Sequence, residues 1–343
     1  FVERHGTRRV DWHRQSGHVG IGANWNSCLR QARGMWVHIL HQDDLVRPGF
    51  YAALKEAIGE QDYTVLGVGA PVPGDTNHDG YVDLQDFGIL KSNEIGRIVD
   101  FEEKPSDPQV LERLVSRPDS DKPYMASMGI YIFGIDALSS LLHDNEGDDF
   151  GKHIIPAAIE SCRVYAYPFE GYWEDIGNIS SFYRANLSLT QQNPPFDFYD
   201  PKDPIYTRSR FLPASRIDGC RMEQVVVANG CRLYNANIEE CVIGLRSMVR
   251  PGAMLRRVIM MGADYYETVE HKAENRLLGR PPIGVGHNAS IERAIIDKNA
   301  RIGKGVVISS HEGEPDRDEE QYSIRDGIVI IPKNTILPDG TTI

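Results

Sequence analysis

The sequence lacks several features that would each mark a particular class of protein. None of its apolar runs reaches the roughly 20 residues that a membrane-spanning helix needs, and the opening FVERHGTRRVDWHRQ is too polar for a secretory signal. Its five cysteines are odd in number and include no C-x-x-C pair, which argues against a disulfide framework and a zinc site. We therefore expect a cytoplasmic protein, with no membrane partner, whose cysteines are buried free thiols.

Positive charge is also scarce. The 343 residues include 37 Lys and Arg against 49 Asp and Glu, which gives a formal net charge of −12 at pH 7. A nucleic-acid surface needs a basic face that neutralises phosphates, so this balance argues against a nucleic-acid partner. A small phosphorylated substrate needs only a local cluster of cations. The length and the 41% of hydrophobic residues predict two globular domains.

The stretch from Gly96 to Leu189 contains most of the candidate site residues. Short apolar runs bounded by turn-forming residues predict strands at Ile98–Phe101 and Met128–Phe133. The first run leads into Glu102–Pro105, in which a lysine at a strand end can hold a phosphate as a point charge; the alternative is a solvated charge cluster. The later segment Trp173–Gly177 combines a ring that can stack on a sugar with carboxylates that can bind a metal.

Helical spacing of apolar residues predicts three helices in the same stretch, at Val110–Ser116, Asp136–His143 and Ser180–Leu189. We interpret Asp136 as the N-cap of the second helix. The apolar side chains of the third helix are predicted to pack in a core. The four prolines of Gln191–Pro204 then predict a linker between domains.

From Tyr206 onward, apolar residues recur about every six positions. The recurring positions are Val227, Leu233, Ile243, Val249, Leu255, Ile296, Ile302 and Ile308. Between them lie glycines suited to a chain that turns a corner after each short strand, namely Gly230, Gly244, Gly252, Gly303 and Gly305. A repeat of this length is the signature of a parallel β-helix. The alternative is an irregular β-sandwich.

Residues 86–343 resemble the ADP-glucose pyrophosphorylase (glucose-1-phosphate adenylyltransferase) family. The resemblance rests on GRIVDFEEKP, KPYMASMGIYIF, DDFGKHIIP and YPFEGYWEDIGNISSFYRANLSL in this order, and on VIGLRSMVRPGA, MMGADYYE and ERAIIDKNARIGKG further on. It implies a nucleotide-sugar-binding α/β domain of the glycosyltransferase A type at residues 1–190. A linker at 191–204 and a left-handed parallel β-helix at 205–343 would follow.

The resemblance also implies an activity and a set of site residues. The family makes ADP-glucose and pyrophosphate from ATP and glucose 1-phosphate with Mg²⁺, for glycogen or starch synthesis, as a homotetramer controlled by a phosphorylated metabolite. The implied substrate-binding residues are Gly88, Glu103, Lys104, Ser127 and Trp173, and Asp175 would bind the metal and the sugar phosphate. The implied effector-binding residues are Lys298, Lys333 and Arg210.

The N-terminal 70 residues resemble a different family, the family-2 inverting glycosyltransferases. The segment HVGIGANWNSCLRQARGMWVHILHQDDLVRPGFYAALKEAI predicts a helix at Asn24–Ala32 and a strand at Trp36–Leu40. Asp43 and Asp44 follow this strand, and paired carboxylates there can hold Mg²⁺ on nucleotide phosphates; alternatively, Asp44 caps the next helix. Aligned with the pyrophosphorylases, Asp43 takes the place of their catalytic aspartate.

One segment of the pyrophosphorylases has no close counterpart. They begin with a glycine-rich loop, GGxGTRLxPLT, that holds the triphosphate, whereas the nearest match here is His5–Arg9, HGTRR. We therefore expect the α/β domain to be incomplete at its N-terminus and the activity to be impaired.

Residues 74–86 have the spacing of a calcium-binding loop. Side-chain oxygens occupy loop positions 1, 3, 5, 9 and 12, as Asp75, Asn77, Asp79, Asp83 and Asp86. Residues 74–94 resemble one dockerin repeat, which implies Ca²⁺; the alternative is an acidic turn without an ion. Because DFGILK also resembles a pyrophosphorylase strand, we predict a strand at Asp86–Lys91.

Three functional hypotheses follow. The first is a glucose-1-phosphate adenylyltransferase. The second is a family-2 glycosyltransferase that uses Asp43 and Asp44 on a metal-bound nucleotide sugar. The third is a regulatory subunit or a defective hybrid without catalytic activity.

Overall fold

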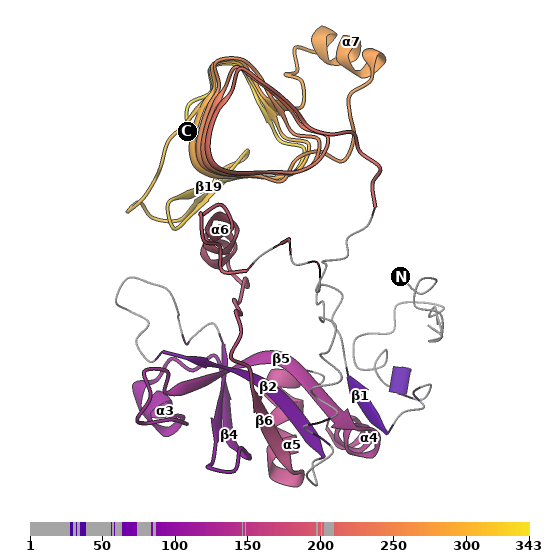
Figure 1. Ribbon diagram of the computed structural model, residues 1–343, viewed down its shortest axis with the longest axis vertical. Coiled ribbons are helices and arrows are strands. Elements are labelled where there is room, and N and C mark those ends of the chain that lie inside the picture. Colours follow the sequence, from indigo (N-terminus) through magenta and orange to yellow (C-terminus); the bar gives the residue numbers. More distant parts are fainter. Residues whose placement is uncertain are drawn as a thin grey trace. The chain divides into compact units, whose positions relative to one another are not determined.

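The computed structural model describes two compact units, Phe1–Trp173 and Glu174–Ile343, which we treat separately (Figure 1). The described residues are 28–29, 32, 35–38, 56, 58, 64–73, 84, 87–145, 147, 149–196, 198–199, 201 and 209–343. Asp43, Asp44 and the five predicted Ca²⁺ ligands between Asp75 and Asp86 lie outside them. None of the described helices is both long and apolar enough to cross a bilayer.

The described residues of the first unit form a six-stranded sheet with the order β4-β3-β5-β2-β6, to which β1 adds by pairing with β5. The strands are β1 Trp36–His38, β2 Val65–Val72, β3 Gly88–Ser92, β4 Ile98–Glu103, β5 Tyr124–Gly134 and β6 Val164–Pro168. Strands β2 and β6 are parallel, and the other pairs are antiparallel. Strand β2 is buried along nearly all of its length, as its unbroken run of apolar and small residues requires.

The strands predicted in this unit are confirmed where the structure describes them, and two are longer than expected. Strand β4 continues to Glu103, and β5 begins at Tyr124. The predicted strand at Trp36–Leu40 is present as β1. The strand expected from Asp86 onward is β3, which begins at Gly88.

In the described part of this unit, the helices with defined bounds are α3 Pro108–Arg113, α4 Ile135–Asp144 and α5 Ile155–Ser161, with a π-helical turn, η2 Phe150–Ile154, before α5. Helix α3 begins earlier than predicted because Asp107 accepts a hydrogen bond from the Gln109 N–H and Pro108 fills the first turn. The predicted cap of α4 is wrong. Its N-cap is Gly134, and Asp136 lies in the first turn, where a negative charge suits the helix dipole.

Helix α6, Ile179–Ser188, packs within the second unit. Its Tyr183 is buried against Ile259, Ile295 and Ile328 of the β-helix, and the Tyr183 hydroxyl donates to the Arg257 carbonyl at 2.6 Å. The core-packing role predicted for this helix is therefore confirmed. The compact division of the chain falls before α6, whereas we expected the first domain to extend to residue 190.

The remainder of the second unit is a β-helix, seen end-on in Figure 1. One parallel sheet contains β7 Arg216–Asp218, β9 Arg232–Tyr234, β11 Met248–Val249, β13 Gly284–Val285, β15 Arg301–Ile302 and β20 Ile336–Leu337. A second sheet contains β8 Arg221–Val227, β10 Asn237–Ile243, β12 Met254–Met260, β14 Ser290–Ile296, β16 Val307–Ile308, β17 Arg317–Asp318, β18 Ser323–Arg325 and β19 Ile328–Ile331. The β-helix prediction is confirmed, and the alternative of a β-sandwich is wrong.

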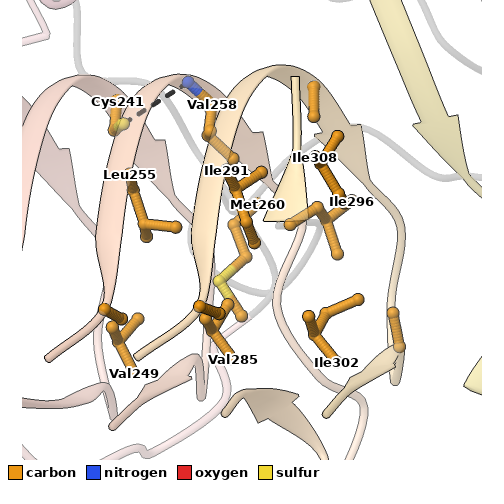
Figure 2. Close-up of a cluster of buried hydrophobic side chains, with 14 of the residues drawn as sticks. Cys241, Val249, Leu255, Val258, Met260, Val285, Ile291, Ile296, Ile302 and Ile308 are labelled. Atoms are coloured by element: carbon orange, nitrogen blue, oxygen red, sulfur yellow. Dashed lines mark hydrogen bonds between the residues drawn. The ribbon is translucent and has the colours of Figure 1, made fainter. Parts of the chain in front are cut away.

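Three ladders of aliphatic side chains fill the interior of the coil (Figure 2). Their members are Leu233, Val249, Val285, Ile302 and Leu337; Ile238, Leu255, Ile291 and Ile308; and Ile243, Met260, Ile296 and Ile331. None of these side chains is more than 3% exposed. Seven of the eight recurring positions found in the sequence belong to these ladders, and Val227 packs against them as a partly buried side chain.

The coils advance in regular steps with one long insertion. Asn237 pairs with Met254, and Ser290 pairs with Val307, each 17 residues further along the chain. Met254 pairs with Ser290 across 36 residues, because the chain between them leaves the coil to form α7, Val269–Leu277. In Figure 1 this helix stands outside the coil.

Glycines meet two different demands at the corners. Gly252 has φ +80°, a conformation that side chains other than glycine rarely adopt. Gly303 is constrained by space instead, since a Cβ there would lie 2.5 Å from the Asp339 backbone nitrogen of the next coil.

The cysteine prediction is correct for two residues only. Cys231 and Cys241 are buried, whereas Cys28 is exposed, and Cys162 and Cys220 are partly exposed. The Cys241 sulfur accepts a hydrogen bond from the Val258 N–H at 3.4 Å (Figure 2). Burial raises the pKa of the Cys241 thiol to about 12.

We expect Ile302→Ala to reduce the free energy of unfolding of the second unit by about 2–5 kcal/mol, because it leaves a cavity in the middle of a ladder. Met254→Ala, at a position 53% exposed, should change this free energy by within about 0.5 kcal/mol. Urea unfolding followed by circular dichroism measures both. Equal losses in the two variants would contradict the role given to the ladders.

Thiol labelling should separate the cysteines. In the native protein at pH 8, we expect a thiol reagent to modify Cys28 rapidly and to leave Cys231 and Cys241 unmodified, because burial both shields their sulfurs and keeps them protonated. Denaturation should make all five reactive. Peptide mass mapping identifies the labelled sites, and labelling of native Cys241 as fast as Cys28 would contradict the buried core.

Candidate active site

The ends of β3 and β4 bring a glycine and a carboxylate together. Gly88 pairs with Glu103 across the two antiparallel strands. A Cβ on Gly88 would lie 2.7 Å from Oε2 of Glu103, and a Cβ on Gly151 in η2 would lie equally close to the same oxygen. Real Cβ contacts are longer than this, so glycine at both positions leaves room for the Glu103 carboxylate. Two residues predicted to bind substrate, Gly88 and Glu103, are thus direct neighbours.

Lys104 ends this edge of the sheet in an unusual backbone conformation. Its φ is 53°, in the left-handed region that residues with a Cβ seldom occupy, and its N–H donates to the Phe87 carbonyl at 2.9 Å. Pro105, which follows, is buried, whereas Lys104 itself is exposed. The backbone around Lys104 is therefore fixed, and the side chain lies where an anionic ligand can reach it.

The third predicted neighbour, Ser127, makes a hydrogen bond within β5 to a residue that the sequence did not single out. The hydroxyl oxygens of Ser127 and Tyr131 are 2.7 Å apart, and the Gly129 N–H donates to Ser127 Oγ at 3.2 Å. Strand β5 bulges between the two residues, with Gly129 at φ +71°. A glycine inside a strand pattern is the sequence signal for such a bulge, and it could have drawn attention to the Ser127 and Tyr131 pair.

The electrostatics connect Tyr131 to Glu103. Tyr131 is only 7% exposed. Burial raises the pKa of its hydroxyl above the usual tyrosine value; the hydrogen bond with Ser127 opposes this shift, and the Glu103 carboxylate adds to it. Tyr131 therefore stays neutral at physiological pH, and its hydroxyl can hold Ser127 in place.

Trp173 lies beside this edge of the sheet. Its ring is 5.4 Å from the ring of Phe87, centroid to centroid, and tilted by 52° to it. Phe87 directly precedes Gly88, and both rings pack against a small core that includes Ile89 and Leu114. The structure thus places Trp173 near the start of β3. Its stacking on a sugar stays a prediction.

Asp175, two residues later, belongs to the second unit. Its Oδ1 accepts a hydrogen bond from the Gly177 N–H at 2.8 Å. The segment then enters α6, whose N-cap Asn178 accepts from the Ser181 N–H. The adjacent Glu174 has a raised pKa, mainly because of desolvation.

The donor chemistry at Asp175 fits a magnesium ion. Mg²⁺ prefers oxygen ligands and is usually held by one or two carboxylates together with substrate phosphates and water. Asp175 supplies such a carboxylate. Among the described residues there is no group of three or more His, Cys, Asp or Glu side chains placed to hold a metal ion. Asp43, the second predicted magnesium ligand, and the predicted Ca²⁺ ligands lie outside those residues.

The two lysines predicted to bind an effector meet at one carboxylate. Lys298 Nζ is 3.4 Å from Asp264 Oδ1, and Lys333 Nζ is 2.7 Å from Asp264 Oδ2. Lys333, joined by Asn299 and Lys298, holds the pKa of Asp264 at about 2. We call Lys298, Lys333 and Asp264 the lysine cluster. Arg210 lies exposed before β7.

Asp264 had no sequence signal of its own. It stands in the segment MGADYYE, which carried the family resemblance without indicating an ion pair. Only the stacking of successive coils brings residues 264, 298 and 333 to one corner.

Two protein-family models match the chain. The Nucleotidyl transferase model matches residues 21–192, which is half of the chain. This match includes most of the segment that resembles the family-2 glycosyltransferases. The model of the GLGC left-handed parallel beta-helix domain matches residues 210–342 and gives the coil its hand. All the described candidate residues fall within these two matches. The chain therefore belongs to the nucleotidyl transferase family and has an ADP-glucose pyrophosphorylase-like architecture.

Proposed function

We propose that the protein is a glucose-1-phosphate adenylyltransferase, which makes ADP-glucose and pyrophosphate from ATP and glucose 1-phosphate for glycogen or starch synthesis. The family membership supports a nucleoside triphosphate and a sugar phosphate as substrates. The observation that carries the proposal is the arrangement of Gly88, Glu103 and Lys104 at one edge of the sheet. It combines an acceptor for sugar hydroxyls with a cation for the sugar's phosphate.

In the proposed reaction, a phosphate oxygen of glucose 1-phosphate attacks the α-phosphorus of ATP. A new P–O bond forms to the sugar phosphate, and the bond to the β-phosphate breaks, so that pyrophosphate leaves with the electron pair. Catalysis of this kind depends on positioning and on neutralising charge, and it needs no covalent intermediate.

Each residue at the edge has a role that its chemistry suits. Lys104 neutralises the phosphate of glucose 1-phosphate. Glu103 accepts hydrogen bonds from glucose hydroxyls, and Ser127, held by Tyr131, provides a further hydrogen bond. Gly88 lets the sugar nucleotide approach the backbone, because it has no Cβ.

In this proposal, Asp43 and Asp175 bind Mg²⁺. When bound, the ion neutralises phosphate charge. Asp175 presents its carboxylate in a turn that the Gly177 N–H fixes, so its orientation is set before the ligand arrives. Trp173 contributes a flat apolar surface for the sugar or base.

The lysine cluster would bind the phosphorylated effector, with Arg210 assisting. Asp264 occupies both ammonium groups in the absence of a ligand, so an incoming phosphate competes with this carboxylate. The depressed pKa of Asp264 keeps it charged from about pH 4 upward. Its competition is therefore constant over the physiological pH range and is lost only as the pH falls toward 2. The homotetramer and the cytoplasmic location implied by the resemblance complete the proposal.

The first test is the formation of ADP-glucose and pyrophosphate from ATP, glucose 1-phosphate and Mg²⁺. We expect turnover by the unaltered protein, loss of turnover in Asp175→Asn, and a KM for glucose 1-phosphate about 10–100-fold higher in Lys104→Gln, since a charged hydrogen bond contributes about 1.5–3 kcal/mol. The KM for ATP should change much less.

Lys122→Gln is the matched control, because this lysine is also exposed and lies just before β5. Its kinetic constants should equal those of the unaltered protein. A folded protein without turnover would refute the catalytic proposal and favour a regulatory subunit or a defective hybrid. Turnover with a nucleotide sugar as donor would favour the glycosyltransferase instead.

The lysine cluster is tested by the response of the initial rate to a panel of sugar phosphates and phosphorylated sugar acids. We expect Lys298→Gln and Lys333→Gln each to raise the concentration needed for half-maximal response about tenfold, and Asp264→Asn to lower it, because the competing carboxylate is gone. Lys304→Gln is the control at an exposed lysine of the same unit. A reduced response in Asp264→Asn would contradict the competition.

A further inference from the structure

The insertion that carries α7 leaves a cavity against the outside of the β-helix. The cavity has a volume of about 650 Å³ and is lined by α7, by the segment before it and by β9 and β11. None of the lysine cluster lines it. The coil does not need this insertion to close, since the step from Ser290 to Val307 closes in 17 residues. The insertion therefore has no evident role in the coil itself.

Cations dominate the lining. It contains six of them, namely Arg232, Arg246, Arg250, Lys272, Arg276 and Arg280, and a single carboxylate, Glu267. We call these six residues the arginine pocket. Among the ion pairs found in the described part of the chain, none involves any of the six.

Glu267 neutralises only part of the charge of the arginine pocket: its carboxylate raises the pKa of Arg250, but its oxygens are bonded to groups outside the six cations. Its Oε1 is 2.7 Å from Arg301 Nη1 and accepts from Asn275 Nδ2 at 2.9 Å. Its Oε2 accepts from the Ile283 N–H at 3.0 Å. The carboxylate is almost fully buried and ties α7 to the coil. The pocket thus has a large excess of positive charge, in a protein whose net charge is −12.

Several of the guanidinium groups are held in place. Arg232 and Arg246 lie 6.0 and 5.9 Å from the centroid of the Tyr266 ring, whose hydroxyl donates to the Gly230 carbonyl at 2.7 Å. Arg250 donates to the carbonyls of Val285 and Ile283. Such fixed side chains lose little freedom when a ligand binds.

The half-buried Arg250 also gives the pocket an energetic reason to take an anion. Desolvation lowers its pKa, which shows that the charged form is stabilised less than in water. The Glu267 carboxylate offsets part of this desolvation and the Arg301 guanidinium adds to it, so an anion bound beside Arg250 would further stabilise its charged form.

We propose that the arginine pocket binds an oligophosphate anion, either free or as part of a nucleotide. Guanidinium groups bind phosphate oxygens in pairs of hydrogen bonds, and several of them around one cavity suit more than one phosphate group. The volume lies in the range of small-molecule sites. The half-exposed ring of Tyr265 at the pocket provides a surface on which a base can stack. This inference does not rest on the proposed catalytic activity.

The test is a calorimetric titration of the full chain, without metal ions, with sodium tripolyphosphate and separately with ATP. The variant is Arg232→Gln combined with Arg276→Gln and Arg280→Gln, three exposed side chains of the pocket. We expect it to raise the Kd of one binding event at least tenfold. The control combines Arg221→Gln, Arg256→Gln and Lys304→Gln, which changes the net charge equally outside the pocket, and should leave the Kd within twofold.

The same titrations show at which site the anion binds. Lys298→Gln combined with Lys333→Gln should retain it, which separates the arginine pocket from the lysine cluster. Tighter binding of ATP than of tripolyphosphate, lost in Tyr265→Leu, supports a nucleotide as the ligand, and equal binding supports a free oligophosphate. Absence of saturable binding, or a Kd in the pocket variant equal to that of the control, would overturn the proposal.

A second measurement needs no variant. Phenylglyoxal modifies accessible arginines, and we expect tripolyphosphate to protect Arg232, Arg276 and Arg280 of the unaltered protein while leaving Arg221 and Arg256 reactive, as mapped by mass spectrometry. Equal modification of the pocket arginines with and without tripolyphosphate would also refute the site.

Discussion

The second unit depends on the stacking of aliphatic side chains in register inside the coil. Each ladder places one apolar residue above another, such as Val249 under Val285 and Ile302, so every coil buries its neighbour's interior face. Burial of these apolar side chains fixes the path of each coil. It does not constrain the segments that leave the coil at a corner. The insertion with α7 and the corner residues of the lysine cluster are therefore free to carry charge. The rigid ladders hold these charges in place.

In the first unit, the decisive constraint is steric. The Glu103 carboxylate lies where side chains at Gly88 and Gly151 would collide with it, so two glycines from separate elements define its position. Lys104 follows in a left-handed turn, and Ser127 is held by a buried, neutral Tyr131. Close packing and a strained turn together place a carboxylate, a cation and a hydroxyl at the edge of one sheet. This arrangement suits a ligand that has both hydroxyl and phosphate groups.

The boundary between the two compact units differs from the end of the nucleotidyl transferase match. Helix α6 lies inside the nucleotidyl transferase match, yet it packs against Ile259, Ile295 and Ile328 of the coil. The nucleotidyl transferase match thus ends at residue 192, whereas the first compact unit ends at Trp173. Asp175 stands close to the division, between Trp173 of the first unit and α6 of the second. The same segment therefore carries a candidate metal ligand and the entry to the second unit.

The sequence by itself determined the β-helix, because a six-residue period of residues such as Val249 and Leu255 reflects burial that each short strand repeats locally. Through the family resemblance, it also marked Glu103, Lys104, Lys298 and Lys333 as candidate binding residues. Only the tertiary structure decided what these residues meet. Gly151 is distant in sequence from Glu103, and Asp264 from Lys333, and no local pattern encodes contacts across η2 and β4 or between successive coils. No local pattern marks the arginine pocket either, because its cations come from separate coils and from an insertion whose packing depends on the buried Glu267 and Arg301 pair.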